Sequence, residues 1–485
     1  MSARDRHAAM AKPRRPRKRQ TYRQQPVIDI EYTGHGVIKP EGKIVFVEDA
    51  LPGEVVDVLV TRSRRSHAFG IVEHYHQRSP QRVEPFCSHF GLCGGCRWQY
   101  LRYAQQLEYK QFFVRSIMRR IGKLEELEFQ PILGCDSERY YRNKLDYSFT
   151  DSRWLSSDEI ESGGENLERR GVGFHVRGRF DRILDIETCY LQPEPSNQIR
   201  RAVRDFSIAA GYSFYNPHSH SGWLRSLVIR TNADAEAMVT VVFGSDQGAE
   251  ERQRLFDMIA EQFLRVVSIN YIINTTLNDS LLAHEVHHAR GAEFIVERCG
   301  ELQLRIHPRS FYQTNGRQAE ALYAVVAEWA DLSGIETVWD LYCGIGSIAL
   351  YLARSAGWVW GVESVEEAID NARENARLNG IDNVLFSSAD VREALAAPAP
   401  DALPGASGVP DLVVLDPPRA GLHPAVVGAI VKLGAPRIIY VSCNPATQAR
   451  DLHMMQDRYT AVRCRPVDMF PQTHHIESVV ELRLR

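Results

Sequence analysis

The C-terminal part of the chain alternates short apolar segments with amphipathic ones, and this alternation restricts the fold more than any other feature of the sequence. Apolar runs occur at 337–341, 358–362, 384–387, 412–415 and 437–441. Segments with the apolar periodicity of helices separate these runs. Strands that alternate with helices are typical of βαβ units, which place their strands in a parallel sheet. The sequence therefore predicts a doubly wound α/β fold for residues 317–485.

The remaining residues divide into three further regions. Residues 1–25 form a basic tail, and short β-branched runs punctuated by glycine predict a small barrel over residues 26–80. Residues 81–316 combine a cysteine cluster, a helical stretch near 103–121 and several strand-like runs, which indicates a mixed α+β domain. At roughly 100–200 residues per domain, the length of the chain is consistent with this division.

Charge is unevenly distributed along the chain. The whole sequence has 58 Lys and Arg against 61 Asp and Glu, but residues 1–25 contain nine Lys or Arg and one acid, Asp5. The tail therefore carries +8, and the rest carries −11, with 49 basic against 60 acidic residues. A basic arm on an acidic body indicates a polyanionic partner, most simply nucleic acid. A solvated tail that only aids solubility is the alternative interpretation.

Composition excludes several classes of protein. With 44% hydrophobic and 25% charged residues, the chain has ordinary globular values, unlike a disordered or collagen-like chain. No stretch approaches the ~20 apolar residues of a membrane-spanning helix, and no apolar signal segment follows the basic start. We expect a cytoplasmic protein without membrane contact. Nine cysteines in such a chain favour metal or catalytic roles over disulfides.

Three cysteines within ten residues form the clearest group of candidate metal ligands. Cys87, Cys93 and Cys96 lie in the segment CSHFGLCGGC, whose paired glycines let the backbone wrap closely around a centre. Cys189 is the candidate for a fourth thiolate. Zinc and an iron–sulfur cluster both accept four thiolates, so the spacing predicts a metal centre without identifying it. Unrelated buried cysteines, or a radical-generating cluster with different spacing, fit the pattern less well.

A glycine turn after the first predicted strand indicates an adenosine-containing cofactor. In the segment DLYCGIGS, Gly344 and Gly346 allow a ligand to approach the backbone above the strand ends. Glu363 ends the second predicted strand, where a carboxylate can accept both ribose hydroxyls. Asp390 ends the third strand, in position for an adenine contact. A dinucleotide and S-adenosylmethionine both satisfy this pattern, and a structural turn without ligand is the alternative.

A thiol and two carboxylates lie at the ends of other predicted strands. Asp416 follows the fourth strand and Cys443 the fifth, and both ends face the crevice that would hold the cofactor. Glu477 directly precedes the last strand. A thiolate that adds to C6 of uracil lets C5 attack an electrophilic methyl group, after which a base must remove the C5 proton. Taken singly, Cys443 could be a core thiol and Glu477 a polar cap, but together they predict methylation of uracil C5.

These motifs resemble the bacterial RNA uracil-5-methyltransferases, and most closely the iron–sulfur branch that acts on 23S ribosomal RNA. The resemblance covers residues 26–485. It implies an RNA-binding TRAM domain, an OB-like barrel, over residues 26–80 and a class I S-adenosylmethionine-dependent methyltransferase fold over residues 317–485. It also implies that Cys443 is the nucleophile and that Glu477 is the base that removes the C5 proton.

The resemblance assigns ligand contacts as well. The four cysteines would hold a [4Fe-4S] cluster, in a central iron–sulfur domain over residues 81–316. Gln313 lies in the segment FYQTN, which is similar to a family motif whose glutamine lies between cofactor and base. The implied S-adenosylmethionine contacts are Gln313, Tyr342, Gly344, Gly346, Ser347, Glu363, Asp390 and Asp416. Ser347 stands where the family commonly has asparagine, and Tyr342 where it commonly has phenylalanine.

A competing motif lies at residues 284–288, where HEVHH satisfies the His-Glu-x-x-His pattern of zinc hydrolases. That mechanism requires both histidines on one face of a helix. Gly291 and the strand-like run at 293–296 instead predict a β-hairpin region, in which the histidines lie on a solvated loop.

We therefore expect a monomeric enzyme that methylates C5 of a flipped uridine in RNA, with 23S ribosomal RNA as the expected target. The same chemistry on transfer RNA is one alternative, and a non-catalytic RNA-binding assembly factor on the same fold is another. An amino-group methyltransferase is disfavoured, because such enzymes need no thiol and have Asn-Pro-Pro-Tyr where this chain has the segment DPPR that begins at Asp416.

Overall fold

The computed structural model describes residues 20–162, 167–281, 283–396 and 408–485. The chain forms two compact units, Met1–Val83 and Glu84–Arg485, which are described separately below. Residues 1–19 of the predicted disordered basic tail lie outside the described residues, and the prediction is wrong for residues 21–25, which lie in a strand, β1 (Thr21–Pro26). Among the described residues, no helix has the length and apolar character that crossing a membrane would require.

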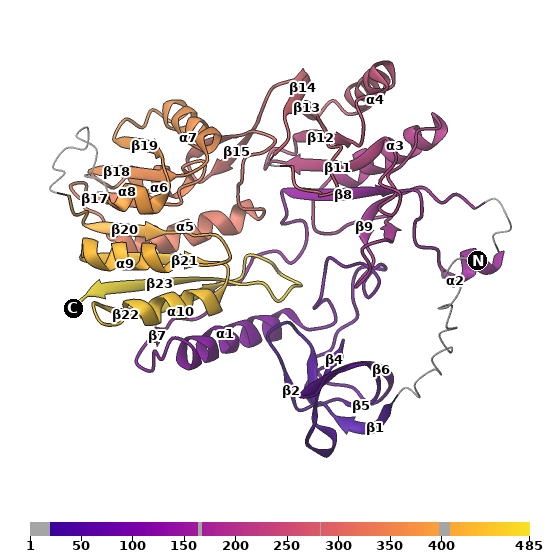
Figure 1. Cartoon of the computed structure of the whole chain (residues 1–485), viewed down its shortest axis with the longest axis horizontal. Coiled ribbons are helices and arrows are strands. Elements are labelled where there is room, and N and C mark those ends of the chain that lie inside the picture. Colours follow the sequence, from indigo (N-terminus) through magenta and orange to yellow (C-terminus); the bar gives the residue numbers. More distant parts are fainter. Residues whose placement is uncertain (1–19, 163–166, 282, 397–407) are drawn as a thin grey trace, which may run out of the picture. The chain divides into compact units, whose positions relative to one another are not determined.

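The first unit is built around a six-stranded sheet in the order β1-β5-β6-β4-β3-β2 (Figure 1). Its strands are β1 (Thr21–Pro26), β2 (Asp29–Ile30), β3 (Gly36–Ile38), β4 (Ile44–Glu48), β5 (Val55–Ser63) and β6 (His67–Gln77), with a short 3-10 helix at Pro40–Gly42. Val45 and Val47 on β4 and Val56 and Val58 on β5 are fully buried. This spacing of two along each strand directs one face of the sheet inward, as the predicted barrel requires.

The second unit contains a seven-stranded sheet in the order β10-β9-β8-β11-β12-β13-β14. Its strands are β8 (Lys144–Thr150), β9 (Gly171–His175), β10 (Ile183–Asp185), β11 (Leu224–Thr231), β12 (Ala237–Phe243), β13 (Val266–Ile273) and β14 (Val286–Gly291). Helices α3 (Ser196–Ala209) and α4 (Ala249–Gln262) pack their apolar residues into the same core as this sheet. The remaining elements here are α2 (Ser157–Ser162) and the hairpin of β15 (Ile295–Cys299) with β16 (Leu302–Ile306).

The C-terminal sheet has eight strands in the order β19-β18-β17-β20-β21-β23-β22-β7. Its strands are β17 (Thr337–Leu341), β18 (Trp358–Glu363), β19 (Val384–Ser388), β20 (Leu412–Leu415), β21 (Arg437–Ser442), β22 (Tyr459–Val467), β23 (Glu477–Leu484) and β7 (Glu128–Phe129). The first five strands in this order are parallel, and β23 is antiparallel to β21. The predicted parallel sheet is therefore confirmed, strand by strand.

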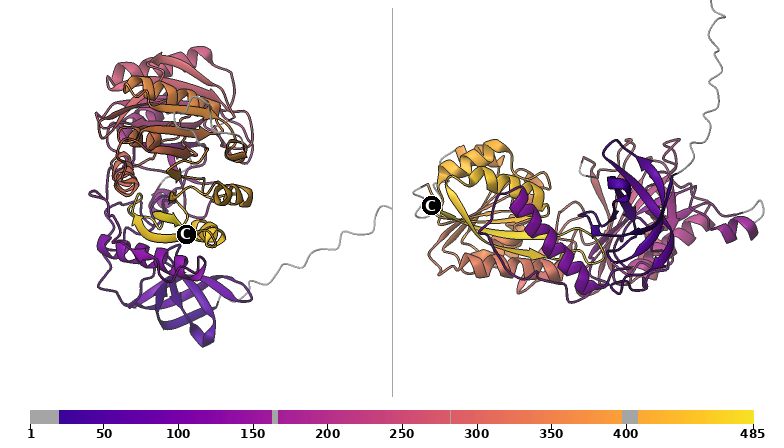
Figure 2. Two further views of the ribbon diagram at one scale, coloured as in Figure 1. Left: turned by 90° about the vertical axis from the view of Figure 1, so that its left-hand side faces the viewer. Right: turned by 90° about the horizontal axis from the view of Figure 1, so that it is seen from below.

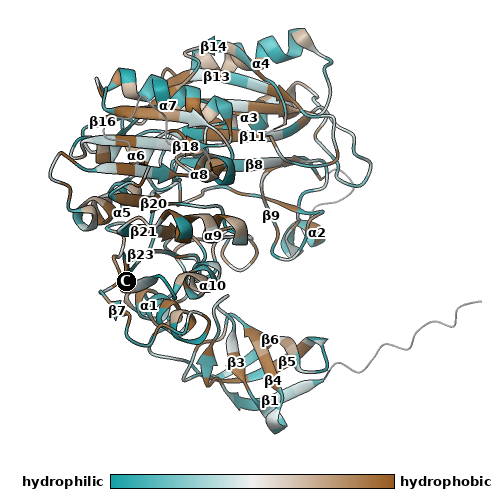
Figure 3. Ribbon diagram, turned by 60° about the vertical axis from the view of Figure 1, so that its left-hand side comes forward, coloured by the Kyte–Doolittle hydropathy of each residue, from teal (hydrophilic) through white to brown (hydrophobic). Residues whose placement is uncertain are grey.

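Six helices accompany this sheet, and their apolar stripes face it. They are α5 (Gly316–Ala330), α6 (Ser347–Ala353), α7 (Glu366–Leu378), α8 (Val391–Ala396), α9 (Pro424–Leu433) and α10 (Pro445–Met455). Figure 3 shows the hydrophilic and hydrophobic stretches that alternate along α7, whose Ile369 and Ala372 are fully buried. The Asn315 side chain caps α5 by accepting a hydrogen bond from the Gln318 N–H. Apolar side chains of α5, α6 and α7 therefore pack in one core with the strands of the sheet and hold the strand ends in place.

A segment from much earlier in the chain completes this sheet. Strand β7 pairs with the edge strand β22, and helix α1 (Tyr103–Arg120) packs against β22 and α10. Figure 2 shows α1 alongside the yellow strands of the sheet. Residues 103–129 thus join the sheet of residues 317–485, although we predicted them within the region 81–316; the boundary at residue 316 stays a prediction.

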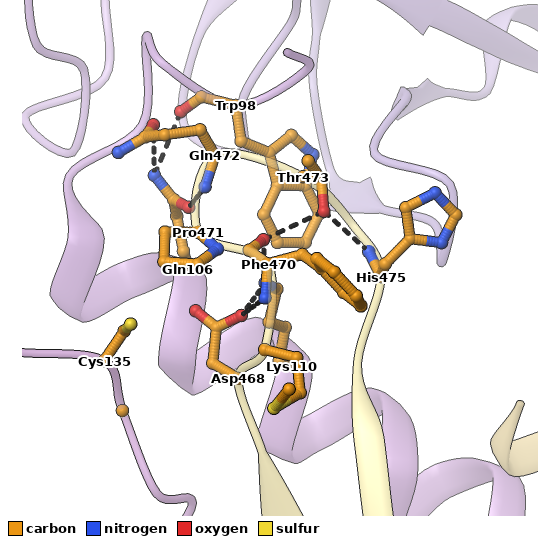
Figure 4. A network of polar contacts seen from close by, with 12 residues as sticks. Trp98, Gln106, Lys110, Cys135, Asp468, Phe470, Pro471, Gln472, Thr473 and His475 are labelled. Atoms are coloured by element: carbon orange, nitrogen blue, oxygen red, sulfur yellow. Dashed lines mark hydrogen bonds and ion pairs between the residues drawn. The ribbon is translucent and has the colours of Figure 1, made fainter. Parts of the chain in front are cut away.

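A buried ion pair fixes α1 to the loop that precedes β23 (Figure 4). The Lys110 Nζ donates to the Asp468 Oδ1 at 2.6 Å, and both side chains are fully buried. Lys110 Nζ also donates to the Phe470 carbonyl at 3.1 Å, and Asp468 accepts from the Tyr103 hydroxyl at 3.0 Å. Each charge therefore has partners that replace the water it has lost.

A second contact holds the same loop, which we name the clamp loop (residues 468–476). The Gln106 and Gln472 side chains bond to each other at 3.0 Å, and the Gln106 Oε1 accepts from the Gln472 N–H at 2.9 Å. The Tyr141 hydroxyl donates to the Pro471 carbonyl at 2.9 Å. Hydrogen bonds from α1 and from Tyr141, which precedes β8, therefore hold the clamp loop directly before Glu477.

Replacing Lys110 with methionine should destabilise the protein, because the Asp468 carboxylate would remain buried without its counter-charge. We expect a loss of about 3–5 kcal/mol in the free energy of unfolding, measured by urea denaturation. The matched control is Arg119→Met, which removes a charge from an exposed position on the same helix and should change the free energy by about 0.5 kcal/mol or less. Equal effects of the two substitutions would contradict a structural role for the ion pair.

Candidate active site

Three acidic groups from three strand ends meet at one edge of the C-terminal sheet. The antiparallel ladder pairs Ser442 on β21 with Ser478 on β23, so the next positions, Cys443 and Glu477, oppose each other. Strand β21 lies between β23 and β20, and Asp416 directly follows β20. The structure therefore brings together the thiol and both carboxylates that the sequence predicted as catalytic residues.

Burial raises the pKa of all three groups, and the charges of the carboxylates add to this effect at Glu477 and Cys443. Burial raises the pKa of Asp416 to about 7, and burial together with the charge of Asp416 raises the pKa of Glu477 well above its usual range. The pKa of Cys443 rises to about 11, first through burial and then through the charges of Glu477 and Asp416, with Arg419 acting in the opposite direction. Burial and neighbouring charge therefore favour the protonated forms of these groups.

The loop after Asp416 is fixed by helix α10. The Arg419 carbonyl accepts hydrogen bonds from the Asn444 amide at 3.1 Å and the Thr447 hydroxyl at 3.3 Å. The Leu422 N–H donates to the buried Asp451 at 2.8 Å. These contacts hold the loop backbone and leave the Arg419 side chain exposed, where its positive charge acts on Cys443.

The glycine turn lies beside this edge, at the end of β17. Three of its residues have positive φ, namely Tyr342 (70°), Gly344 (54°) and Gly346 (83°). A Cβ atom at Gly346 would lie 2.8 Å from the Phe386 ring, whereas one at Gly344 would meet nothing within 4 Å. Gly346 is therefore required by packing, and Gly344 leaves open space in which a ligand can approach the backbone.

Asp340, inside β17, is a site residue that the sequence analysis did not single out. It is fully buried; burial, and then the charge of Asp416, raises its pKa to about 8, while a backbone hydrogen bond from Ala349 acts in the opposite direction. The signal in the sequence was an acid inside an otherwise apolar strand.

The predicted adenosine contacts surround the same turn. Glu363 ends β18, and its Oε1 accepts from the Ser364 N–H at 2.7 Å and the Val365 N–H at 3.1 Å. Asp390 follows β19 and binds Arg392, which lowers its pKa and keeps it ionised. The pKa of Tyr342 rises to about 12 through burial and then through the charges of nearby acids that include Asp390 and Glu363.

The two remaining predicted cofactor contacts lie nearby. Ser347 begins α6, where its hydroxyl bonds the buried Tyr323. Gln313 is only 8% exposed, and Asn143 holds its backbone through a 3.0 Å hydrogen bond to the Gln313 carbonyl. After burial, the charges of Asp416 and Asp340 contribute to the raised pKa of Tyr323. The start of α6 is therefore connected through Tyr323 to the strand end that carries Asp416.

The four candidate metal ligands share one cavity in the second unit. Cys87, Cys93, Cys96 and Cys189 all line a cavity of about 560 Å³, and all four are free thiols. Burial, together with the other thiols, raises the pKa of Cys96 to about 12 and of Cys189 to about 11. Within the described ranges, however, no group of three or more His, Cys, Asp or Glu side chains is arranged to hold a metal ion.

The His-Glu-x-x-His segment does not form a helix. Both His287 and His288 lie on strand β14, at the edge of the seven-stranded sheet. The His287 ring stacks on Tyr271 with centroids 4.7 Å apart, and the His288 Nδ1 contacts the Asn270 amide oxygen at 3.2 Å. The prediction of a β region in place of a zinc helix is confirmed, but the predicted solvated loop is wrong for His287 and His288, which lie on a strand.

The fold and the turn define the class of the protein. The strand order, the antiparallel β23 and the glycine turn after β17 are those of a class I S-adenosylmethionine-dependent methyltransferase. The family described as TRAM domain matches residues 28–72, and the family described as tRNA (Uracil-5-)-methyltransferase matches residues 294–485.

Similar proteins agree with this class. An uncharacterized RNA methyltransferase of Bacteroides thetaiotaomicron is 43% identical over 93% of this chain and 99% of its own length. One from Porphyromonas gingivalis is 42% identical over 94% and 98%. The crystal structure of Pyrococcus abyssi tRNA (uracil-54, C5)-methyltransferase with S-adenosyl-L-homocysteine has a TM-score of 0.71 and 29% identity over 95% of this chain and 100% of that chain.

The chain belongs to the TRAM-containing RNA uracil-5-methyltransferase family. It is an RNA methyltransferase that uses S-adenosylmethionine. The predictions of the class I fold, the TRAM domain, the cofactor and an RNA substrate are therefore confirmed.

Replacing Asp416 with asparagine should make Cys443 more reactive, because the substitution removes a negative charge that raises the pKa of the thiol. At about pH 9 Asp416 is ionised in the wild type, so a lower thiol pKa should speed alkylation by iodoacetamide, about threefold for a pKa lowered by one. The measurement is the rate of labelling of the Cys443 peptide by mass spectrometry.

The Cys135 peptide is the internal control, since the charges that act on that thiol are those of Asp468 and Asp136. At about pH 5.5 Asp416 is protonated in the wild type, and the two proteins should label Cys443 at the same rate. Slower labelling of the variant at high pH would contradict the electrostatic coupling.

Proposed function

We propose that this enzyme methylates C5 of a uridine in 23S ribosomal RNA through covalent addition of Cys443 to C6. The observation that carries the proposal is the position of Cys443 and Glu477 directly beyond the last pair of the β21–β23 ladder, Ser442 with Ser478, with Asp416 at the end of the neighbouring strand. A nucleophile and a base on opposite strands can act on adjacent carbons of one flat ring.

In the proposed mechanism, Cys443 first gives up its thiol proton to solvent; the thiolate then forms a bond to C6 of the flipped uracil, and the electron pair of the C5–C6 double bond shifts toward the C4 oxygen, which forms the enolate. Bound S-adenosylmethionine supplies the electrophilic methyl group that C5 attacks. The Glu477 carboxylate then takes the proton from C5, which restores the double bond and expels the thiolate. Glu477 must be ionised to accept this proton, and the raised pKa makes the carboxylate, once ionised, a strong proton acceptor.

We assign the cofactor to the glycine turn at the end of β17. The open space at Gly344 fits a ligand that approaches the backbone of the turn. Glu363 would accept the ribose hydroxyls, and Asp390 would contact the adenine. The further proposed contacts are Gln313, Tyr342, Gly346, Ser347 and Asp416.

We further propose that the four cavity cysteines hold a [4Fe-4S] cluster with a structural role. The four thiols line one cavity, and four thiolates are the ligand set of such a cluster. Two neighbouring glycines, Gly94 and Gly95, allow the backbone to follow the cavity wall.

The target RNA has two candidates. The four cysteines and the motifs of the C-terminal fold resemble the branch that acts on 23S ribosomal RNA. The similar crystal structure from Pyrococcus abyssi is titled as a methyltransferase of uracil 54 in tRNA, which favours transfer RNA as the second candidate.

Two substitutions test the mechanism, in assays with labelled S-adenosylmethionine and transcripts of 23S ribosomal RNA and transfer RNA. Cys443→Ala should incorporate no methyl group, because no thiolate activates C5. Glu477→Gln should trap a covalent protein–RNA adduct that survives denaturing electrophoresis, because the C5 proton is not removed. The 23S transcript should be the substrate of the wild type.

Calorimetry with S-adenosylmethionine provides the control, since both variants should bind the cofactor as the wild type does. Methyl incorporation by Cys443→Ala would contradict the mechanism. A wild-type protein that binds RNA but no S-adenosylmethionine would instead be an assembly factor.

The cluster is tested by the visible absorbance of anaerobically purified protein. The wild type should show the broad absorbance of an iron–sulfur cluster, and Cys189→Ser should lose it. Cys135→Ser, a partly exposed thiol outside the cavity lining, should keep it. Zinc in metal analysis, without visible absorbance, would contradict the proposal.

A further inference from the structure

The cavity that the four cysteines share has a second end, which is basic. Lys144 on β8 and Arg230 on β11 stand directly opposite each other in the antiparallel ladder, and both line the cavity. Arg142, two residues before Lys144, lines it as well. Like charges directly opposite on neighbouring strands destabilise a sheet, so this arrangement requires an explanation.

The protein compensates these three cations only in part. Asp146 lies 3.7 Å from the Lys144 ammonium, but the Asp146 side chain is 59% exposed. The buried Glu297 also acts on Arg230, although burial raises the pKa of Glu297 and so favours its neutral form.

Arg230 retains an unused donor although it is almost completely buried. Its exposure is 3%, and its Nη2 donates to the Ser310 carbonyl at 3.1 Å. Its Nη1 has no hydrogen-bond partner among the described residues, nor has the Nε of Arg142. Buried donors are nearly always paired, so an acceptor from outside the chain is missing at this end of the cavity.

The cysteine end of the cavity has a cation of its own. Arg177 donates to the Cys96 carbonyl at 3.4 Å, and its charge acts on the Cys93 thiol. The cations of the basic end instead act on one another, because Arg230 and Arg142 both lower the pKa of Lys144. The two ends are therefore electrostatically distinct.

The basic end also lies next to the catalytic machinery. Asn143, between Arg142 and Lys144, donates to the carbonyl of Gln313, one of the proposed cofactor contacts. The Arg142 guanidinium lies 5.8 Å from the Phe470 ring centroid in the clamp loop, which leads directly to Glu477. Phe311, also on the cavity wall, is 70% exposed and offers a flat apolar face on which a base can stack.

We propose that Arg142, Lys144 and Arg230 form a subsite for a phosphodiester of the RNA next to the target uridine. This inference deepens the proposed function, on which it rests for the position of the uridine. A phosphate provides several acceptor oxygens and a negative charge, which together satisfy the unpaired guanidinium donors and relieve the repulsion between Lys144 and Arg230. An exposed aromatic ring beside a basic groove is typical of sites that bind single-stranded RNA.

The test is the salt dependence of binding to fluorescein-labelled oligouridylate, measured by fluorescence anisotropy at a series of KCl concentrations. Removing one phosphate contact should reduce the slope of log K against log [KCl] by about 0.7 for a single strand. We expect this reduction, with weaker binding at low salt, for Lys144→Met and for Arg142→Gln. Arg230→Lys, which keeps the charge, should retain most of the slope.

Two control variants separate this proposal from the proposed function. Arg298→Gln removes an exposed cation that is paired with Asp234 and lies outside the cavity lining, and it should leave the slope unchanged. Cys443→Ala should also keep the wild-type slope, because the measurement needs no methyl transfer. The salt-dependence experiment therefore tests the phosphate subsite even if the proposed catalytic mechanism is wrong.

Three outcomes would overturn the proposal. The first is an unchanged slope in both Lys144→Met and Arg142→Gln. The second is weaker S-adenosylmethionine binding by calorimetry with an unchanged slope, which would assign the cations to the cofactor carboxylate. The third is a loss of visible absorbance with an unchanged slope, which would make them counter-charges of the cluster. Thermal unfolding identifies any variant that fails to fold, and the other variants then decide.

Discussion

The buried ion pair between Lys110 and Asp468 is the contact on which the geometry of the catalytic edge depends. It joins helix α1 to the clamp loop across 358 positions of sequence, and both of its charges are fully buried. A buried charge that loses its partner costs several kcal/mol, so the two elements cannot separate without a large penalty. Since Glu477 follows the clamp loop directly, this restraint fixes the approach of the proposed base to Cys443.

The catalytic edge itself concentrates acidic groups where water is scarce. Asp340, Asp416, Glu477 and Cys443 all have raised pKa values, and burial is the first cause in each case. Raised pKa values of this kind are typical of groups that transfer protons in catalysis. We propose that the open space at Gly344 receives the cofactor, so that the methyl donor would lie beside Asp416 and Cys443.

Local sequence patterns predicted the C-terminal sheet because each strand is a short apolar run with marked ends. The run predicted at 358–362 became Trp358–Glu363, and the one at 437–441 became Arg437–Ser442. The same logic predicted that Asp416, Cys443 and Glu477 lie at neighbouring strand ends, and their catalytic roles stay a prediction. The sequence predicted a metal centre at four cysteines. The structure places all four on one cavity, and the metal or cluster that they hold stays a prediction.

Features that depend on pairing between segments far apart in the chain could not be predicted from local sequence patterns. Strand β7 has only two residues and exists because β22 offers an open edge. The opposition of Lys144 and Arg230 depends on the register between two strands that lie far apart in the chain. The local periodicity of a sequence does not indicate which polar side chains will contact each other across two strands.

The release of tritium from RNA that contains [5-3H]uridine tests the central claim most directly. Methylation at C5 must expel the hydrogen of that carbon, whereas methylation at any other atom leaves it in place. We predict that, with unlabelled S-adenosylmethionine, the wild-type enzyme releases one tritium per methyl group from a 23S ribosomal RNA transcript and none from transfer RNA. Methyl transfer to the 23S transcript with all tritium retained would contradict the account.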